Sequence, residues 1–134
     1  MHSSDRFSEA PVSKLIGFQV DPASVLDREL GKAVVHLDLD ERFFNPMGRV
    51  HGGILSALAD AAMGIAFGRA LDADQDFSTI DLQIQYMRPV QCRRVTATAR
   101  IKQRGLRIGF VECEIVDDRG RSIACATCTC TSLS

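Results

Sequence analysis

Residues 52–67 read GGILSALADAAMGIAF, and this stretch determines most of the fold expected for the chain. Alanine and leucine favour a helix, and apolar residues lie on nearly every side of it, which is typical of a buried helix rather than a surface helix. Between Arg49 and Arg69 the only titratable side chains are His51 and Asp60. Because an aspartate in the middle of the stretch is costly in lipid, we expect a buried core helix and not a membrane span.

Strand patterns lie on both sides of this helix. Residues 31–40 alternate between apolar and polar, as a half-buried strand does, and His36 on the polar face is interpreted as a sheet-surface residue rather than a catalytic one. Four more strands are expected over residues 77–87, 95–103, 108–116 and 121–131, with Ser78, Ile80 and Leu82 on one face of the first. This order predicts an α+β fold in which a curved, mainly antiparallel sheet wraps around one long central helix. The exposed faces and edges of such a sheet favour a homo-oligomer.

The length and charge of the chain exclude several classes of protein. Its 134 residues predict a single domain over residues 1–134, of which residues 1–12 are expected to be a flexible N-terminal segment. Sixteen Lys and Arg against seventeen Asp and Glu give a net charge of −1, which argues against nucleic acid as a partner. The first residues contain no apolar run of the signal-peptide kind. We therefore expect a cytoplasmic protein that has no membrane partner.

The five cysteines indicate structural thiols rather than a metal or redox centre. Cys125 and Cys128 form a C-x-x-C pair, but the segment around them is typical of a strand, whose side chains alternate between faces. Cys125 should therefore point away from Cys128 and Cys130, and Cys92 and Cys113 stand alone in the sequence. We expect reduced cysteines that behave as small apolar residues, with no bound metal.

Asp60 is the candidate for chemistry, because an isolated carboxylate in an apolar helix needs a hydrogen bond, a partner or a function. The alternative is that it faces a solvent-filled seam or bonds to Ser56, one turn earlier. At the start of the same helix, His51, Gly52 and Gly53 leave backbone amides that can polarise a carbonyl. Asp60 follows His51 by nine residues and faces another direction, so one site that uses both needs a second subunit.

Four linked motifs carry a resemblance to a known family. They are NPMGRVHGG at residues 45–53, LADAAMG at 58–64, STIDL at 78–82 and YMRP at 86–89. In their order and spacing they resemble the hotdog-fold acyl-CoA thioesterases, and within them the phenylacetate-degradation (PaaI-type) group, over roughly residues 15–131. The resemblance implies a sheet wrapped around one helix, dimers with the active site at the interface, and a homotetramer built as a dimer of dimers.

The resemblance also implies roles for individual residues. Gly52 would supply the amide that polarises the thioester carbonyl, while Asn45 and His51 of the same subunit would orient the thioester or the water. Asp60 of the facing subunit would be the general base or the nucleophile, and Ser78 would help to hold the attacking water, with Thr79 as the neighbouring alternative. Asn45 has a second interpretation, in which it only makes the turn before Pro46. Coenzyme A is part of the substrate, and no cofactor is expected.

Coenzyme A brings phosphates, for which arginine is a suitable ligand. The candidates for phosphate contact lie on or between the later strands, and none is preferred: Arg88, Arg93, Arg94, Arg104 and Arg107. Two other functions compete with hydrolysis. A hotdog dehydratase or hydratase would carry a His-Phe-Pro-Gly signature, where this chain has VHGG at residues 50–53. A non-catalytic acyl-CoA sensor would have no use for a carboxylate beside the thioester, so the acyl-CoA thioesterase is favoured.

Overall fold

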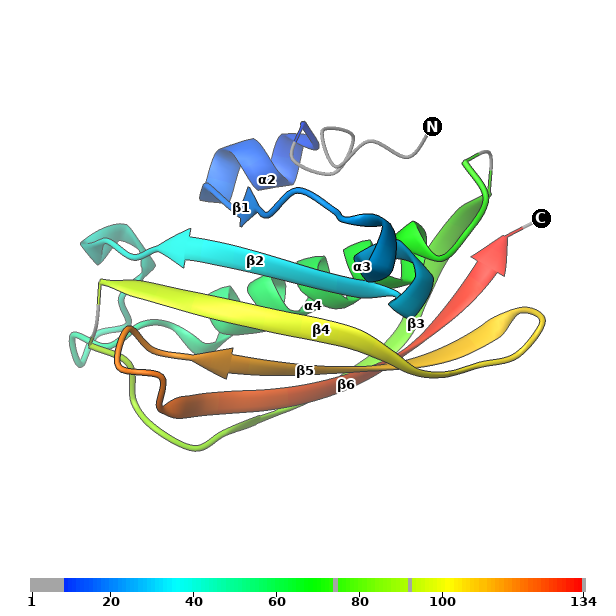
Figure 1. The fold of residues 1–134 in the computed structure, drawn as a ribbon. Coiled ribbons are helices and arrows are strands. Elements are labelled where there is room, and N and C mark those ends of the chain that lie inside the picture. The colour runs from blue at the N-terminus through cyan, green and yellow to red at the C-terminus, as the bar shows by residue number, and fades with distance from the viewer. Residues whose placement is uncertain (1–8, 74, 92, 134) are drawn as a thin grey trace.

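A computed structural model describes residues 9–73, 75–91 and 93–133 of the chain, and it has one layer of sheet packed against one long helix (Figure 1). The six strands run in the order β1-β2-β4-β5-β6-β3, and every neighbouring pair is antiparallel. The predicted α+β class is confirmed. The elements are α2 (Pro11–Ile16), β1 (Gln19–Val20), α3 (Val25–Leu30), β2 (Lys32–Asp38), η1 (Glu41–Phe43), α4 (Gly52–Arg69), β3 (Asp76–Tyr86), β4 (Arg94–Arg104), β5 (Ile108–Val116) and β6 (Ser122–Leu133).

The N-terminal part contains one helix, α3, that the sequence analysis did not predict. Residues 1–8, most of the segment expected to be flexible, lie outside the described residues, and Pro11 begins the short helix α2. Residues 25–30 form α3, because the Ser24 side chain accepts from the Asp27 amide while the Asp27 carboxylate accepts from the Ser24 amide. This reciprocal cap satisfies two of the amides that a helix start leaves unpaired.

The hydrophobic core lies between α4 and the inner face of the sheet. Phe67 of α4 is 1% exposed and packs edge-on against Phe77 of β3, with the ring centroids 5.7 Å apart. β5 approaches this ring through Gly109, where an added Cβ would lie 2.4 Å from Phe67 Cε1. The inward residues of three strands alternate with exposed or half-buried ones, as the period of a strand requires: Ala33, Val35, Leu37, Val95, Ala97, Ala99, Val111, Cys113 and Ile115.

A β-bulge in β3 changes which side chains face the helix. The pairing of β3 with β6 shifts between Thr79 and Asp81, so Ile80 is left over and is 57% exposed. Before the bulge Thr79 faces inward and Ser78 is exposed, whereas after it Leu82 faces inward. The expectation that Ser78, Ile80 and Leu82 share a face was therefore wrong, because an extra residue reverses the alternation of a strand.

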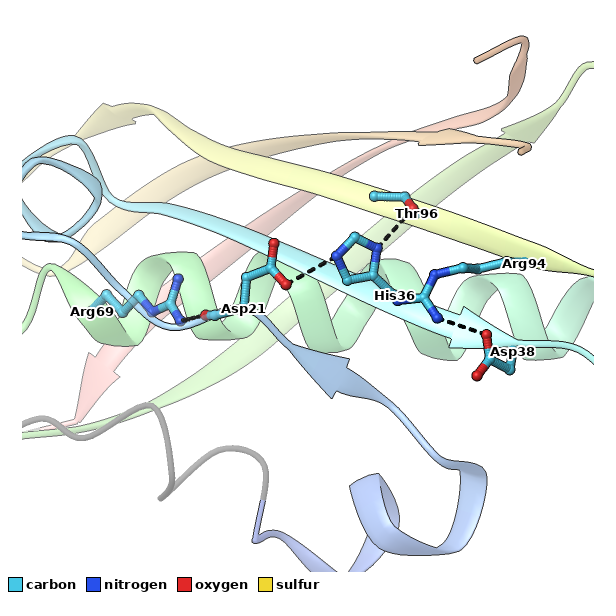
Figure 2. A network of polar contacts seen from close by, with 6 residues as sticks. All are labelled: Asp21, His36, Asp38, Arg69, Arg94 and Thr96. Carbon is cyan, nitrogen blue, oxygen red and sulfur yellow. Dashed lines mark hydrogen bonds and ion pairs between the residues drawn. The ribbon is translucent and has the colours of Figure 1, made fainter. Parts of the chain in front are cut away.

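His36 belongs to a polar network on the outer face of the sheet, which Figure 2 shows from close by. Its Nδ1 lies 2.8 Å from Thr96 Oγ1 and its Nε2 lies 3.0 Å from Asp21 Oδ1. The buried Arg69 side chain donates to the backbone oxygens of Asp21 and Lys32, at 2.7 and 3.0 Å. These contacts fasten the segment after β1 to the sheet and to the end of α4. They agree with a structural interpretation of His36.

The thiols of β6 lie on the faces that the strand pattern predicts. Cys128 and Cys130 are buried with their Sγ atoms 3.6 Å apart, while Cys125 is half-buried on the other face. Burial raises the pKa of Cys113 to about 12, so that thiol stays protonated at neutral pH. The four cysteines within the described ranges are free, and Cys92 lies outside those ranges. Within the described ranges no helix is long and apolar enough to cross a membrane. The same ranges contain no group of three or more His, Cys, Asp or Glu side chains that could hold a metal ion.

Candidate active site

The first turn of α4 holds one free amide donor. His51 is the N-cap, and its Nδ1 accepts a hydrogen bond from the Gly53 amide at 2.8 Å. Within the described part of the chain, the Gly52 amide has no acceptor. Because the positive end of the helix dipole lies at this amide, Gly52 is placed to donate to an oxygen that gains negative charge.

Gly52 lines a cleft of about 320 Å³ between the loop before α4 and the loop after β3. Asn45 shapes the first loop, since its Oδ1 accepts from the amides of Met47 and Arg49 at 3.0 and 3.1 Å. The Val50 amide then donates to Val90 O of the second loop at 3.3 Å. The turn interpretation of Asn45 is therefore observed, and its proposed contact with substrate stays a prediction. The cleft is lined by Asn45, Arg49, Val50, Gly52, Leu55, Tyr86, Met87, Arg88, Pro89 and Val90.

Tyr86 is a residue of this cleft to which the sequence analysis assigned no role. Its hydroxyl donates to the Gly52 carbonyl at 2.7 Å, which ties the end of β3 to the start of α4. A Cβ at position 52 would lie 3.0 Å from Tyr86 Cζ. The YMRP motif at residues 86–89 signals the segment, but a sequence does not show which backbone atom a tyrosine reaches.

Asp60 lies away from the cleft of its own subunit. It follows Gly52 by eight residues, about 12 Å along the helix axis, and it does not line the cleft. The residue is exposed, and its Oδ1 accepts a hydrogen bond from Thr79 Oγ1 at 3.0 Å. Of the two alternatives for Asp60, the bond to Ser56 does not occur in the described structure, whereas its exposure agrees with a solvent-facing position. One chain therefore brings Asn45, His51 and Gly52 together and leaves Asp60 apart.

Ser78 does not reach Asp60 within one chain. It is exposed, and its hydroxyl donates only to the backbone oxygen of its neighbour, Thr79, at 3.4 Å. The bulge turns Thr79 towards α4 in its place. The predicted role of Ser78 stays a prediction, and Thr79 is the residue of this pair that contacts the candidate catalytic carboxylate.

A second cleft of about 400 Å³ shares Pro89 and Val90 with the Gly52 cleft, and its charged lining residues are Arg93, Arg119 and Arg121 together with Asp117 and Asp118. Arg121 pairs with Asp117 at 2.8 Å, whereas Arg93 and Arg119 make no ion pair with any described residue. Burial works against the charge on Asp117, but hydrogen bonds from Arg121 and from the Arg119 amide outweigh it and lower the pKa of that carboxyl.

Two of the five arginines named as phosphate ligands are engaged elsewhere. Arg94 pairs with Asp38 at 2.8 Å, as Figure 2 shows, and Arg104 donates to the Ala70 carbonyl at 2.8 Å. Arg119, which the sequence analysis did not single out, lies in the turn between β5 and β6 and lines the second cleft.

A sheet packed on one long helix, with a cleft at the start of that helix, is the arrangement expected of a hotdog-fold thioesterase, and comparisons with known proteins agree with this class. Residues 47–124 match the model of the Thioesterase superfamily. The 1,4-dihydroxy-2-naphthoyl-CoA hydrolase of Listeria monocytogenes is 29% identical over 105 residues, which cover 78% of this chain and 85% of that protein.

Solved structures show the same fold. A phenylacetic acid degradation-related protein from Ralstonia eutropha superposes with a TM-score of 0.83 at 30% identity, covering 96% of this chain and 97% of that chain. The PaaI protein of Escherichia coli superposes with a TM-score of 0.86 at 22% identity, covering 98% and 90%. The chain belongs to the thioesterase superfamily and has the hotdog fold, as its motifs predicted, so it is a thioester hydrolase by family.

Proposed function

We propose that this chain is an acyl-CoA thioesterase, which hydrolyses the thioester of an acyl- or aryl-acyl-CoA to a free acid and coenzyme A. The observation that carries the proposal is the amide of Gly52, a residue of the cleft, which has no described acceptor. The next amide, that of Gly53, already donates to His51 Nδ1. A single unpaired amide at a helix start suits the oxygen of a thioester carbonyl.

The chemistry needs little beyond this donor and one carboxylate. When the carbonyl carbon is attacked, its oxygen gains charge, and the Gly52 amide stabilises that charge. Asp60 either takes a proton from the attacking water, which gives the free acid directly, or attacks the carbon itself, which gives an anhydride that water then hydrolyses to the acid and the free carboxylate. Both routes release the thiolate of coenzyme A. A thiolate is a good leaving group, so no strong general acid is required.

The proposal requires a second copy of the chain, because Gly52 and Asp60 do not meet within one. β3 supports such a pairing: it is an edge strand that bonds to β6 on one side, and Thr79 on it contacts Asp60. Among the described strands only β6 pairs with β3, and the edge of a strand of this length is a ready surface for another strand. We infer a homodimer that places Asp60 of one copy at the Gly52 cleft of the other, and the dimer of dimers stays a prediction.

The second cleft, whose lining has three arginines and two aspartates, suits the phosphate end of coenzyme A. It adjoins the Gly52 cleft at Pro89 and Val90, and two of its arginines, Arg93 and Arg119, have no described ion-pair partner. One guanidinium group can donate two parallel hydrogen bonds to two oxygens of a phosphate. The substrate would then have its thioester at Gly52 and its nucleotide at these arginines.

Thiol release from a panel of acyl-CoAs (phenylacetyl, hydroxybenzoyl, and short, medium and long chains) tests the proposal. Asp60→Asn should lower kcat by orders of magnitude, while Asp72→Asn, an exposed carboxylate outside the site, should stay within a few fold of the unaltered chain. Coenzyme A esters that bind without turnover would refute hydrolysis and favour the sensor.

The Gly52 amide has its own matched pair of variants. Gly52→Pro removes the N–H, and proline is tolerated at the first helical position when the preceding residue is extended, as His51 is at φ −62° and ψ 132°. Gly52→Ala adds the same Cβ near Tyr86 but keeps the N–H. We expect Gly52→Pro to lose about 100-fold or more in kcat relative to Gly52→Ala. Equal activity of the two variants would remove the amide from the mechanism.

A further inference from the structure

Two consecutive glycines begin α4, and each of them leaves room for a neighbouring side chain. Neither Gly52 nor Gly53 has a positive φ, so their backbone conformation does not require glycine. A Cβ at position 52 would lie 3.0 Å from Cζ and from the hydroxyl oxygen of Tyr86, and a Cβ at position 53 would lie 2.9 Å from His51 Nδ1. The close approach of these two side chains is therefore what requires the glycines.

A helix start made of two glycines is flexible unless other groups hold it. Glycine loses more backbone freedom than any other residue when a helix forms, and it is a poor helix former. His51 holds one end of this turn, since its amide donates to Phe43 O at 2.7 Å and its Nδ1 accepts from the Gly53 amide at 2.8 Å. Tyr86 holds the other side, since its hydroxyl donates to Gly52 O at 2.7 Å.

Tyr86 itself has a fixed position at the end of β3. It pairs with Ala124 of β6, and the amide of the next residue, Met87, donates to Ile123 O at 2.7 Å. Tyr86 is 49% exposed, so burial in the core does not explain why its ring lies against Gly52. The hydroxyl bond is the contact that connects this flexible turn to the sheet.

We propose that Tyr86 is a positioning residue of the active site: its hydroxyl fixes the peptide unit after Gly52, so that the Gly52 amide has one direction before the thioester binds. This inference deepens the proposed function and rests on it, although the hydrogen bond exists independently of that function. An oxygen that gains charge is stabilised most by donors that need no reorganisation during the reaction. A turn that samples several conformations would offer its amide in the right direction for only part of the time.

Tyr86→Phe tests the proposal because it removes the hydroxyl and keeps the ring. We expect kcat to fall about tenfold, with KM within about twofold of the unaltered chain, since the amide acts mainly on the charged oxygen of the transition state. Ser24→Ala is the matched control: it removes the cap of α3, which is outside the cleft, and so lowers stability without touching the first turn of α4. Its kcat should equal that of the unaltered chain.

A spectroscopic measurement follows the amide without turnover. The probe is a ketone analogue of the panel ester that the chain hydrolyses fastest, in which CH2 replaces the sulfur and the carbonyl carbon is carbon-13. A hydrogen bond to the carbonyl oxygen withdraws electrons from this carbon and moves its resonance downfield. We expect a downfield shift on binding to the unaltered chain and to Ser24→Ala, a smaller shift with Tyr86→Phe, and the smallest with Gly52→Pro. An unreduced shift or an unchanged kcat in Tyr86→Phe would overturn the proposal.

Two further outcomes separate this proposal from the proposed function. If Tyr86→Phe and Ser24→Ala lose kcat equally, Tyr86 contributes only to stability and the proposal is wrong. If the unaltered chain hydrolyses no acyl-CoA, the proposed function fails, and amide exchange in a chain labelled with nitrogen-15 glycine then decides whether Tyr86 fixes the turn. The Gly53 signal is assigned by its loss in Gly53→Ala. Faster exchange of this amide in Tyr86→Phe than in Ser24→Ala supports the fixing of the turn by Tyr86, and equal exchange refutes it.

Discussion

Gly109 of β5 lies against the ring of Phe67 from the central helix, so replacing it by alanine tests how rigid the core is. The added Cβ would lie 2.4 Å from Phe67 Cε1 and 3.0 Å from Cδ1. Two carbon atoms prefer about 3.5–4.0 Å, so the overlap exceeds an ångström. The Phe67 ring has no room to yield, since it is 1% exposed and packs against Phe77 at a centroid distance of 5.7 Å.

The expected cost of Gly109→Ala is at the upper end for overpacking. A methyl group inserted into a close-packed core costs about 1–3 kcal/mol, and a contact this short on an immobile ring should cost about 3 kcal/mol. For a chain of this size, such a loss lowers Tm by about 10 °C.

Urea and thermal unfolding followed by circular dichroism measure this cost, at one fixed protein concentration, since assembly affects apparent stability. Gly105→Ala is the control in the same hairpin, because a Cβ there meets only the Ile108 carbonyl oxygen at 3.5 Å, an ordinary contact. We expect Gly105→Ala to stay within about 0.5 kcal/mol of the unaltered chain. If Gly109→Ala unfolds with the same midpoint as Gly105→Ala, β5 and α4 can separate freely and the reasoning is refuted.

Three further predictions follow from individual contacts. Asp117→Asn should lower the free energy of unfolding at neutral pH. Because the folded state lowers the pKa of Asp117, the difference in stability between the variant and the unaltered chain should shrink as the pH falls below about 4, and urea unfolding at several pH values measures it. Arg93→Ala combined with Arg119→Ala should raise KM about tenfold for an acyl-CoA, but not for a thioester without the nucleotide, in steady-state kinetics. Tyr86→Phe loses the bond to the Gly52 carbonyl and should lower the free energy of unfolding by about 0.5–1 kcal/mol in urea.

Much of the fold was predictable because the hydrophobic pattern repeats over long segments. The helix expected over residues 52–67 is α4, and the strand expected over residues 108–116 is β5 with the same limits. α3 was harder to predict, since only its cap, formed between Ser24 and Asp27, distinguishes residues 21–30 from a loop. Six residues provide too little periodicity to show a preference.

The candidate site was predictable in its residue types and less so in its contacts. Asp60 stood out because it is the one carboxylate in an apolar helix, and Gly52 because it begins that helix. Ser78 was preferred to Thr79 from the spacing of the motif, because the bulge that turns Thr79 towards Asp60 depends on the pairing of β3 with β6, which a sequence does not show. Arg119 was missed for a related reason: turn residues carry no periodic signal, and their neighbours come from distant loops.

Because Gly52 and Asp60 lie far apart on one helix, two inactive variants of the chain should complement each other. A chain with Gly52→Pro keeps its carboxylate, and a chain with Asp60→Asn keeps its amide, so each lacks a different half of the proposed site. When the two inactive chains are unfolded together and refolded as a mixture, each mixed pair has both defects in one of its two sites and an intact Gly52 and Asp60 in the other. The mixture should therefore be active although neither variant is active alone. Such activity would show that one site takes its residues from two copies of the chain.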